Sequence, residues 1–362
     1  MKRIIFRISL AVLIIIGFYL IYNTLYIYPK YDGKNPLSVN NIESQTFIIN
    51  SESDTVLVGR KGTLLKIYKN SFHYCNGEIV HGKVEVEFKE IVTENDLVLS
   101  GLTTTSNGKL LETAGMFYIN VQQEDKQLCL IDNGRIGIVV PAKEINMQMK
   151  MFNGVVLNDT INWQNPVALL NNPDPVAFGT VPESFIDSLG MQRARYMAIS
   201  LGIIGRGIPQ YVDSLKQYYD SLYQEYNSIE EELYYVFETN NIGWINIDRF
   251  IEQNETVEVE LAVLVNNNSD FQNTYIRLVF VDLQSSIDAF KNNHNQFVFG
   301  KSITSKVNLP IENKAIIIAT AYKKGKPYYD LKEITISKNQ TIELNLEKTT
   351  AKDLREALLK CL

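Results

Sequence analysis

The chain has 362 residues, enough for two or three domains at about 100–200 residues each. Its hydrophobic fraction of 45% and charged fraction of 21% are those of a globular protein that buries hydrophobic cores. The net charge of −6, without a cluster of Lys and Arg, argues against a nucleic-acid partner, because phosphate binding requires a basic surface.

The N-terminal residues predict a membrane anchor. Residues 8–27 contain no charged side chain, and they reach the ~20 residues that a helix needs to cross the bilayer hydrocarbon. Lys2, Arg3 and Arg7 precede them, so we expect a single-pass protein with a cytoplasmic N-terminus and its body in the periplasm or outside the cell. Bulky residues throughout favour an uncleaved signal anchor over residues 1–28, with a cleaved signal peptide as the alternative.

A polar linker at 29–40 precedes a region, residues 41–165, in which strand patterns dominate. Many short apolar or alternating segments are separated there by turn residues, which is typical of an antiparallel β-sandwich. The segment DLVLSGL, residues 96–102, is interpreted as one of these strands. The region is therefore expected to form a first β-sandwich domain.

Alternation is clearest in the segment KVEVEFKE, residues 83–90. Such a period of two predicts a strand with one buried face and one face in water. The expected buried residues are Val84, Val86 and Phe88. We assign the acidic residues of this segment to the solvated face, namely Glu85, Glu87 and Glu90.

The segment GLTTTSNGKLLETAGMFYINV, residues 101–121, predicts a β-hairpin. Its Asn107-Gly108 pair favours a two-residue type I′ turn, which would place Thr103 opposite Glu112. A catalytic carboxyl needs a partner and a pocket, and no partner is evident near Glu112. We interpret Glu112 as a structural hydrogen-bonding residue, with a catalytic role as the alternative.

Residues 166–240 predict a connector followed by a helical insertion. We expect one helix at 183–201 and a second at 212–236, where apolar residues recur at alternating spacings of three and four. This apolar seam favours packing within the chain over a homo-oligomeric coiled coil. It consists of Val212, Leu215, Tyr219, Leu222, Tyr226, Ile229, Leu233 and Val236.

Residues 241–362 predict a second, immunoglobulin-like β-sandwich domain that ends in a short helix capped by Thr350. The segment GWINIDRF, 243–250, gathers Trp244, Asp248 and Arg249. Such an aromatic and acidic group can bind sugars, but more often the tryptophan fills a domain junction and the Asp–Arg pair fixes a turn.

The scarce cysteines and histidines limit the chemistry. The chain has three of each, without a C-x-x-C pair or a His-rich pattern, so we predict no metal and no cofactor. A disulfide between Cys75 and Cys129 is compatible with an oxidising compartment, but the sequence favours three buried thiols. His73, Tyr74 and Cys75 form a triplet that could support self-cleavage, and a loop with a half-buried cysteine is the favoured interpretation.

Three segments carry a family resemblance: GTLLKIYKNSF at 62–72, the stretch 82–121, and GWINIDRF at 243–250. Together they resemble a group of uncharacterised, envelope-targeted proteins of Gram-negative bacteria. The first domain of that group is similar to the β-sandwich shared by zonula-occludens and netrin-receptor proteins. The group usually has a proline where this chain has Tyr68, and two glycines where it has Ala114-Gly115. The resemblance covers roughly a third of the chain, and it implies an architecture but no catalytic residues.

These observations predict a mainly β protein with an α-helical insertion and an N-terminal transmembrane helix. We expect a membrane-anchored, extracytoplasmic binding or structural protein of the bacterial cell envelope, with protein or polysaccharide as its partner. No enzymatic activity is inferred. The alternative is an envelope hydrolase or a self-cleaving β-sandwich that uses Cys75 and His73. The candidates for a structural or interaction role are Glu112, Trp244, Asp248 and Arg249.

Overall fold

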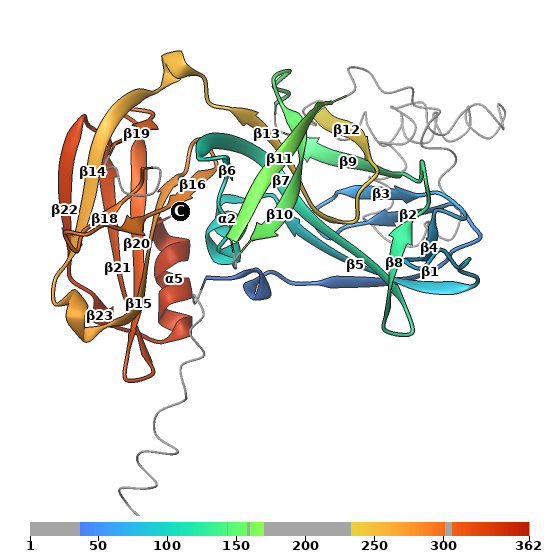
Figure 1. The fold of residues 1–362 in the computed structure, drawn as a ribbon, viewed down its shortest axis with the longest axis horizontal. Helices are drawn as coiled ribbons and strands as arrows, with labels where there is room; N and C mark the ends of the chain where they lie inside the picture. The colour runs from blue at the N-terminus through green and yellow to red at the C-terminus, as the bar shows by residue number, and fades with distance from the viewer. Residues whose placement is uncertain (1–36, 143, 158–159, 170–232, 301–305, 362) are drawn as a thin grey trace, which may run out of the picture. The chain divides into compact units, whose positions relative to one another are not determined.

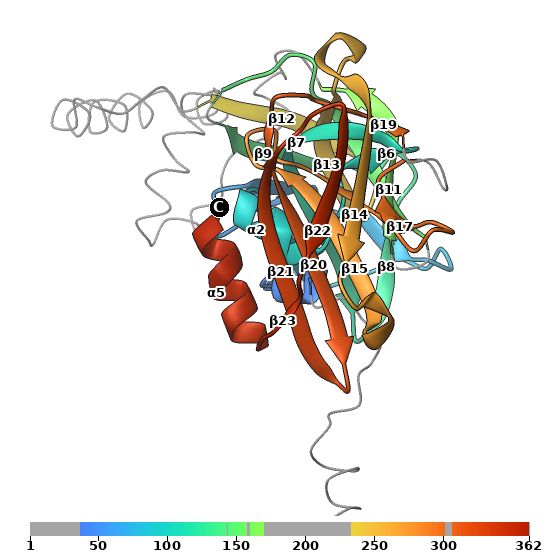
Figure 2. The ribbon, with the colours of Figure 1, turned by 90° about the vertical axis from the view of Figure 1, so that its left-hand side faces the viewer.

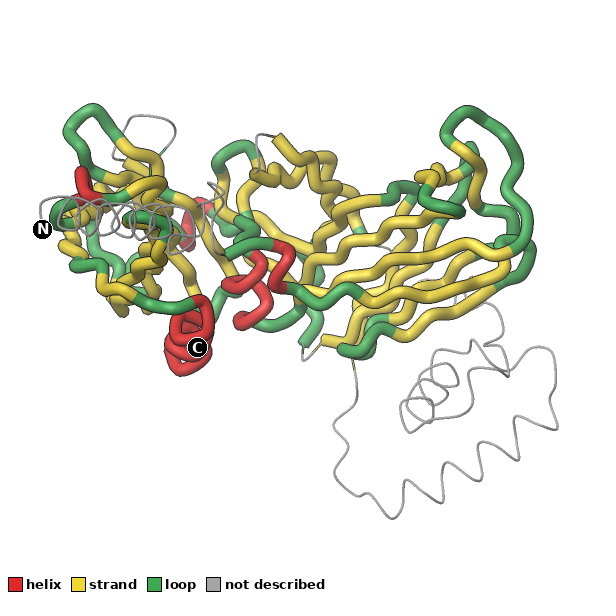
Figure 3. Tube along the Cα trace, turned by 90° about the horizontal axis from the view of Figure 1, so that it is seen from below, coloured by secondary structure: helices red, strands yellow, loops and turns green. Residues whose placement is uncertain are grey.

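The computed structural model describes residues 37–142, 144–157, 160–169, 233–300 and 306–361 (Figure 1). These residues form a mainly β protein with several antiparallel sheets and few short helices, as the predominance of strands in Figure 3 shows. The chain divides into two compact units. The first unit comprises Val39–Ile251 with Leu283–Ser285, and the second unit is built from Glu252–Asp282 and Ser286–Leu362.

The larger sheet of the first unit has nine strands, and its main path runs β1-β5-β7-β13-β10-β11. Neighbours along this path pair antiparallel, and the short strands β4, β6 and β8 pair beside it. The strands are β1 (Gln45–Asn50), β4 (Phe72–Tyr74), β5 (Lys83–Ile91), β6 (Thr105–Ser106), β7 (Lys109–Gln123), β8 (Lys126–Leu130), β10 (Lys150–Leu157), β11 (Thr160–Ala168) and β13 (Gly243–Phe250).

A four-stranded sheet, in the order β12-β9-β3-β2, completes the first unit. Residues of both sheets contribute to one hydrophobic core, which includes Leu65, Phe88, Phe117, Ile138, Phe237 and Ile247. The strands of the smaller sheet are β2 (Thr55–Val58), β3 (Leu64–Ile67), β9 (Ile136–Ala142) and β12 (Leu233–Thr239).

Strand β5 confirms the predicted alternation and corrects the assignment of one acid. Val84, Val86 and Phe88 are buried in the core as expected. Glu90, which we assigned to the solvated face, is buried instead. It has the same parity as the three apolar residues, so the alternation itself places its carboxylate on the inner face.

The expected strand at 96–102 is wrong, because Glu94–Ser100 form helix α2. The Thr93 hydroxyl accepts a hydrogen bond from the Asp96 N–H at 3.2 Å, and the Asp96 carboxylate accepts one from the Thr93 N–H at 3.1 Å. This capping box satisfies two backbone donors at the helix start. Gly101 ends the helix with a left-handed φ of 67°. Local capping therefore outweighs an apolar pattern too short to distinguish a strand from a helix.

The end of the expected helix at 212–236 is also wrong, since Leu233–Thr239 form strand β12 and pair with β9 along its whole length. The sequence LYYVFET is rich in aromatic and β-branched residues, which favour a strand with a partner. Val236 thus lies in a sheet opposite Val139. The rest of this helix and the one expected at 183–201 lie outside the described residues.

The expected domain boundary at residue 241 differs from the observed division. Strand β13, which contains GWINIDRF, pairs with β7 on one side and with β10 on the other. The first unit therefore continues to Ile251, and the second unit begins at Glu252. In the sequence this strand was grouped with its chain neighbours, whereas its hydrogen-bonding partners precede it by more than 90 residues, with Asn153↔Ile245 the nearest pair.

The second unit contains two sheets of five strands each. In one, β14 pairs antiparallel with β18 and β19 and parallel with β22, while β17 pairs with β18. The other runs β16-β15-β20-β21-β23. The strands are β14 (Val257–Val265), β15 (Gln272–Phe280), β16 (Ser285–Asp288), β17 (Phe290–Lys291), β18 (Phe297–Val298), β19 (Lys306–Leu309), β20 (Lys314–Lys323), β21 (Lys326–Thr335), β22 (Asn339–Leu344) and β23 (Glu347–Lys348).

Two predicted features of the second unit are confirmed. Strands β20 and β21 form the hairpin expected around Gly325, with Lys324 and Gly325 both at positive φ. Helix α5, Ala351–Cys361, begins where expected, and the Thr350 hydroxyl accepts a hydrogen bond from the Asp353 N–H at 3.1 Å. Figure 2 shows α5 beside β21, with which it is in contact. Short 3-10 helices complete the fold at Val39–Asn41 (η1), Gln253–Glu255 (η4) and Asn268–Asp270 (η5).

Within the described residues, no helix combines the length and the hydropathy that a membrane crossing requires. The anchor predicted at 8–27 lies outside them.

Candidate functional site

The central strand pair β7–β13 brings together the four residues singled out in the sequence. Arg249 lies opposite Glu112, Asp248 opposite Thr113, and Trp244 opposite Tyr118. The predicted hairpin that leads into β7 is confirmed, because Asn107 and Gly108 both have the positive φ angles, 49° and 75°, of a type I′ turn.

A β-bulge in β7 sets the geometry of this region. Ile247 lies opposite Gly115, but Asp248 lies opposite Thr113, so Ala114 is the extra residue. Gly115 has a φ of 154°, and a Cβ there would come within 3.0 Å of the Phe117 ring. The bulge therefore requires glycine at this position. Its N–H donates to the Thr113 hydroxyl at 3.1 Å, which holds the Thr113 side chain in place.

Glu112 and Arg249 form a partly buried ion pair. Arg249 Nη2 donates a hydrogen bond to Glu112 Oε2 at 2.5 Å. The side chain of Arg249 is 10% exposed and that of Glu112 is 21% exposed. Glu112 was expected to accept a hydrogen bond, and its donor is Arg249 in strand β13. The structure also corrects the expected Asp248–Arg249 pair, because Arg249 contacts Glu112 and lies on the opposite face of β13 from Asp248.

Asp248 belongs to a buried hydrogen-bonded cluster with Thr113 and Asn246. The Thr113 hydroxyl donates to Asn246 Oδ1 at 2.8 Å, and the Asn246 amide donates to Asp248 Oδ2. Asp248 is 0% exposed. Burial raises the pKa of Asp248 well above its usual range; contact with Thr113 opposes this shift and the charge of Glu112 adds to it. The cluster therefore favours a neutral, protonated carboxyl, which is a hydrogen-bonding group in a protein interior.

Trp244 lies at the other end of β13 and packs on Tyr118, with ring centroids 5.0 Å apart. Burial raises the pKa of the Tyr118 hydroxyl. This aromatic pair is separate from the Asp248 cluster along the strand. The sugar-binding combination suggested by the sequence would need Trp244 and Asp248 to face one ligand, and Asp248 is buried.

A second buried carboxylate, Glu90, was missed in the sequence. It accepts hydrogen bonds from Gln45 Nε2 at 2.8 Å and from the N–H groups of Lys61 and Thr63 at 3.2 and 3.3 Å. A Cβ at Gly59 would lie 2.3 Å from its Oε2 atom, so a larger residue at position 59 would require the carboxylate to move. Glu90 therefore anchors the turn between β2 and β3 onto β5. Alternate residues of β5 face the core, and continuing this alternation from Phe88 would have predicted that Glu90 is buried.

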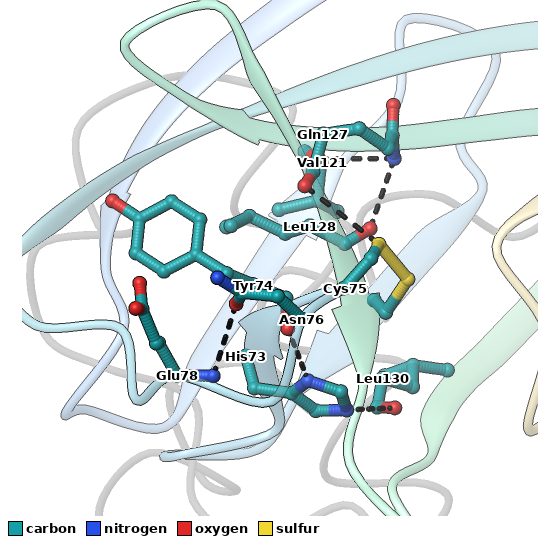
Figure 4. Close-up of a disulfide and its surroundings, with 10 residues drawn as sticks. His73, Tyr74, Cys75, Asn76, Glu78, Val121, Gln127, Leu128 and Leu130 are labelled. Atoms are coloured by element: carbon teal, nitrogen blue, oxygen red, sulfur yellow. Dashed lines mark hydrogen bonds between the residues drawn. A yellow bond between two sulfur atoms is a disulfide. The ribbon is translucent and has the colours of Figure 1, made fainter.

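The structure also pairs Cys75 with Cys129 in a disulfide, contrary to the favoured interpretation of three buried thiols (Figure 4). The two cysteines lie diagonally across the β4–β8 pair, in which His73 is opposite Cys129. The His73 ring lies between carbonyl oxygens, with Nδ1 2.5 Å from that of Tyr74 and Nε2 3.0 Å from that of Leu130. The pairing of β4 with β8 brings the two cysteines together. Their spacing in the sequence does not indicate this pairing.

Burial limits the chemistry of these carboxyl groups, because a substrate in solution cannot reach them. The carboxyl groups of Asp248 and Glu90 are buried and engaged with amide and backbone groups, which stabilises the fold. Within the described ranges, no three His, Cys, Asp or Glu side chains are grouped so as to hold a metal ion. Comparison with known proteins found no matching family model and no match among curated proteins.

We predict that Glu112 and Arg249 are energetically coupled. A double-mutant cycle with Glu112→Ala and Arg249→Ala should give a coupling energy of about 1–3 kcal/mol in urea unfolding, because the pair is mostly shielded from water. The exposed pair Lys306–Glu258 is the matched control and should give less than about 1 kcal/mol. Equal coupling energies for the two pairs would contradict the structural role of Glu112.

We predict that Asp248 makes the unfolding free energy depend on pH. Its pKa is raised in the folded protein, so the folded state binds the extra proton, and stability falls as the pH rises above about 4, the usual pKa of an aspartate. The slope should approach ~1.4 kcal/mol per pH unit and end once the pH passes the folded-state pKa. Asp248→Asn should remove this contribution.

The measurement is urea unfolding of the wild type and Asp248→Asn at a series of pH values. Asp132→Asn, at an exposed position, controls for the loss of one carboxylate. Parallel stability profiles for the wild type and Asp248→Asn would show that folding does not raise the pKa of Asp248.

We predict that reducing the Cys75–Cys129 disulfide destabilises the first unit. The cysteines are 54 residues apart, and the chain-entropy model gives about 4 kcal/mol for closing a loop of this size. Urea unfolding with and without a reductant measures the loss. The Cys75→Ser/Cys129→Ser double variant should be insensitive to the reductant; an equal response of both proteins would mean that the disulfide is absent.

Proposed function

We propose that this protein is a membrane-anchored, extracytoplasmic binding or structural protein of the bacterial cell envelope. The observation that carries the proposal is the Cys75–Cys129 disulfide. Disulfides persist in oxidising compartments such as the periplasm and the cell surface, and they are rare in the cytoplasm. A disulfide in the body of the chain agrees with the direction in which the apolar segment 8–27 and its preceding basic residues would insert.

We further infer that both units are β-sandwiches. In the first unit, one hydrophobic core takes residues from the nine-stranded and the four-stranded sheet, which supports two packed layers. In the second unit, two five-stranded sheets of mainly antiparallel strands support an immunoglobulin-like arrangement, from which the parallel pair of β14 and β22 departs. Such domains commonly present loops and strand ends to partners, which fits a binding or structural role with a protein or polysaccharide of the envelope.

The alternative of a self-cleaving protein or a hydrolase based on Cys75 and His73 is weaker. Nucleophilic attack by cysteine requires a thiolate, and the Cys75 sulfur is bonded to that of Cys129. The His73 ring contacts backbone carbonyl oxygens on both sides. The intact mass of the oxidised protein tests this alternative, since self-cleavage would give two fragments.

We predict that residues 1–28 hold the protein in the membrane. The full chain should sediment with membranes and resist extraction with sodium carbonate, whereas a chain lacking residues 1–28 and exported by a cleavable signal peptide should be soluble. Thiol labelling before and after reduction reports the compartment, because export allows the Cys75–Cys129 disulfide to form. A full-length protein found in the cytosolic fraction with three free thiols would refute the proposal.

A further inference from the structure

The nine-stranded sheet has a face that points away from the hydrophobic core and is exposed over part of its area. Side chains alternate between the two faces of a sheet, and the core takes Val86, Phe88 and Ile119 from β5 and β7. Their chain neighbours therefore point to the other face, where strand pairing aligns them in three rows. The rows are Ile48–Glu85–Gln122, Thr46–Glu87–Asn120 and Lys89–Tyr118–Trp244. We call these nine residues, all of them partly or fully exposed, the open face.

The Tyr118–Trp244 pair lies where the open face ends. The next row along the sheet consists of Ile91, Met116 and Asn246, and all three are buried. Asp248 lies further in the same direction and is also buried. The two aromatic side chains are therefore the last ones on this face of the sheet that a ligand in solution can reach.

The sheet holds the two aromatic rings in place. Their centroids are 5.0 Å apart and their planes are tilted by 44°, so each ring covers at most one face of the other. The backbone beside Trp244 is that of Gly154, where a Cβ would lie 2.6 Å from the Trp244 Cβ. A side chain at position 154 would therefore displace Trp244. Tyrosine and tryptophan fixed in this way offer a large amphipathic contact at a low cost in side-chain entropy.

Hydrogen-bond acceptors adjoin the aromatic pair. Glu85 accepts a hydrogen bond from Gln122 at 2.8 Å, and Glu87 accepts one from Ser44 at 2.6 Å. A carboxylate has two oxygens with about four acceptor positions, so both groups keep acceptor capacity for a ligand. Burial and, to a smaller extent, the charge of Glu87 raise the pKa of the Tyr118 hydroxyl, which shows that this carboxylate acts on the aromatic pair.

The composition of the open face favours a neutral, hydroxyl-rich ligand. Lys89 is its one cation, and the Lys89 ammonium donates to the carbonyl oxygens of Val39 and Ile42 at 3.4 and 3.2 Å. The two carboxylates would repel an acidic polymer. A protein partner would bury aliphatic side chains, and Ile48 is the one aliphatic residue of the nine. A sugar ring presents C–H groups on its faces and hydroxyl groups at its rim, which match aromatic faces and carboxylate or amide acceptors.

We propose that the open face binds a neutral polysaccharide of the cell envelope, with the Tyr118–Trp244 pair stacked on sugar rings. Glu87 and Asn120 bind the sugar hydroxyl groups. From β1 to β13 the sheet spans three strand spacings, about 14 Å at ~4.8 Å each, which accommodates a short oligosaccharide. The carboxylate that accompanies Trp244 is thus Glu87, in place of the buried Asp248. This inference rests on the proposed binding role and names the partner and the surface.

The test is isothermal titration calorimetry of the full chain, kept in a detergent without a sugar headgroup. The neutral probes are cellohexaose and chitohexaose, and the hexamer of galacturonic acid is an anionic probe of equal length. We expect binding of a neutral hexasaccharide, with the anionic hexamer at least about tenfold weaker. The chain has two tryptophans, of which Trp163 is 0% exposed. Bound sugar should therefore protect Trp244 fluorescence from quenching by acrylamide.

Variants locate the binding surface. Trp244→Ala and Tyr118→Ala should each weaken binding by about tenfold or more, because the stacked rings supply the central contact. Tyr328→Ala is the matched control, since it removes one ring of the aromatic pair with Phe271 in the second unit and should leave the affinity unchanged. If an alanine variant melts at a lower temperature, Trp244→Phe and Glu87→Gln replace it. Each of these should weaken binding by about threefold or more.

Three results would overturn the inference: no binding of either neutral hexasaccharide, equal affinity for the galacturonic acid hexamer, or unchanged affinity in the variants of the open face. The envelope location is measured separately, by sedimentation of the full chain with membranes. A membrane-bound protein that binds no neutral sugar would therefore refute this inference and leave the proposed location standing.

Discussion

The first unit depends on the pairing of β13 with β7. These strands come from distant parts of the chain, and β13 also joins β10, so the nine-stranded sheet is continuous only when β13 is in place. The pairing fixes the register through groups that tolerate little displacement. A slip of one residue would turn Asp248 and Asn246 toward the hydrophobic core and Ile247 out of it. It would also separate Arg249 from Glu112 and leave a shielded charge without its partner. The bulge at Ala114 and the positive φ of Gly115 belong to this register, and a side chain at position 115 would crowd the Phe117 ring.

Local patterns in the sequence predicted the local structure well. Alternation predicted β5, the Asn107-Gly108 pair predicted its turn, and Thr350 predicted the start of α5. Apart from helix α2, whose capping box is local, the errors arose where partners distant in the sequence decide the structure. Leu233 and Val236 fit the spacing of the predicted helical seam but lie in strand β12, where β9 supplies the hydrogen bonds. Strand β13 was grouped with its chain neighbours because its amino-acid composition does not indicate that β7 is its partner. The parity of Glu90 could have predicted its burial, but the donors that satisfy it lie in the turn between β2 and β3.

For the candidate site residues too, the sequence identified individual side chains but not their partners in distant strands. The sequence identified Glu112 and favoured a hydrogen-bonding role, and the structure supplies the donor, Arg249. It identified Asp248 but not Asn246 and Thr113, since the cluster exists only in the paired strands. These groups hold strands together, and the disulfide from Cys75, which follows β4, to Cys129 in β8 adds a covalent link in the same unit. The disulfide is compatible with the proposed location outside the cytoplasm, because disulfides persist in oxidising compartments.

The most direct test of this account is native-state hydrogen exchange of the full chain at increasing urea concentrations. The account predicts that amides of β13 exchange as slowly as those of β7 and that both lose protection together, because one opening event breaks their shared ladder. Strands β14 and β20 of the second unit should follow their own, separate dependence on urea. If β13 instead lost protection together with β14 and β20 while β7 stayed protected, the strand would belong to the second unit, and the pairing on which the first unit depends would be wrong.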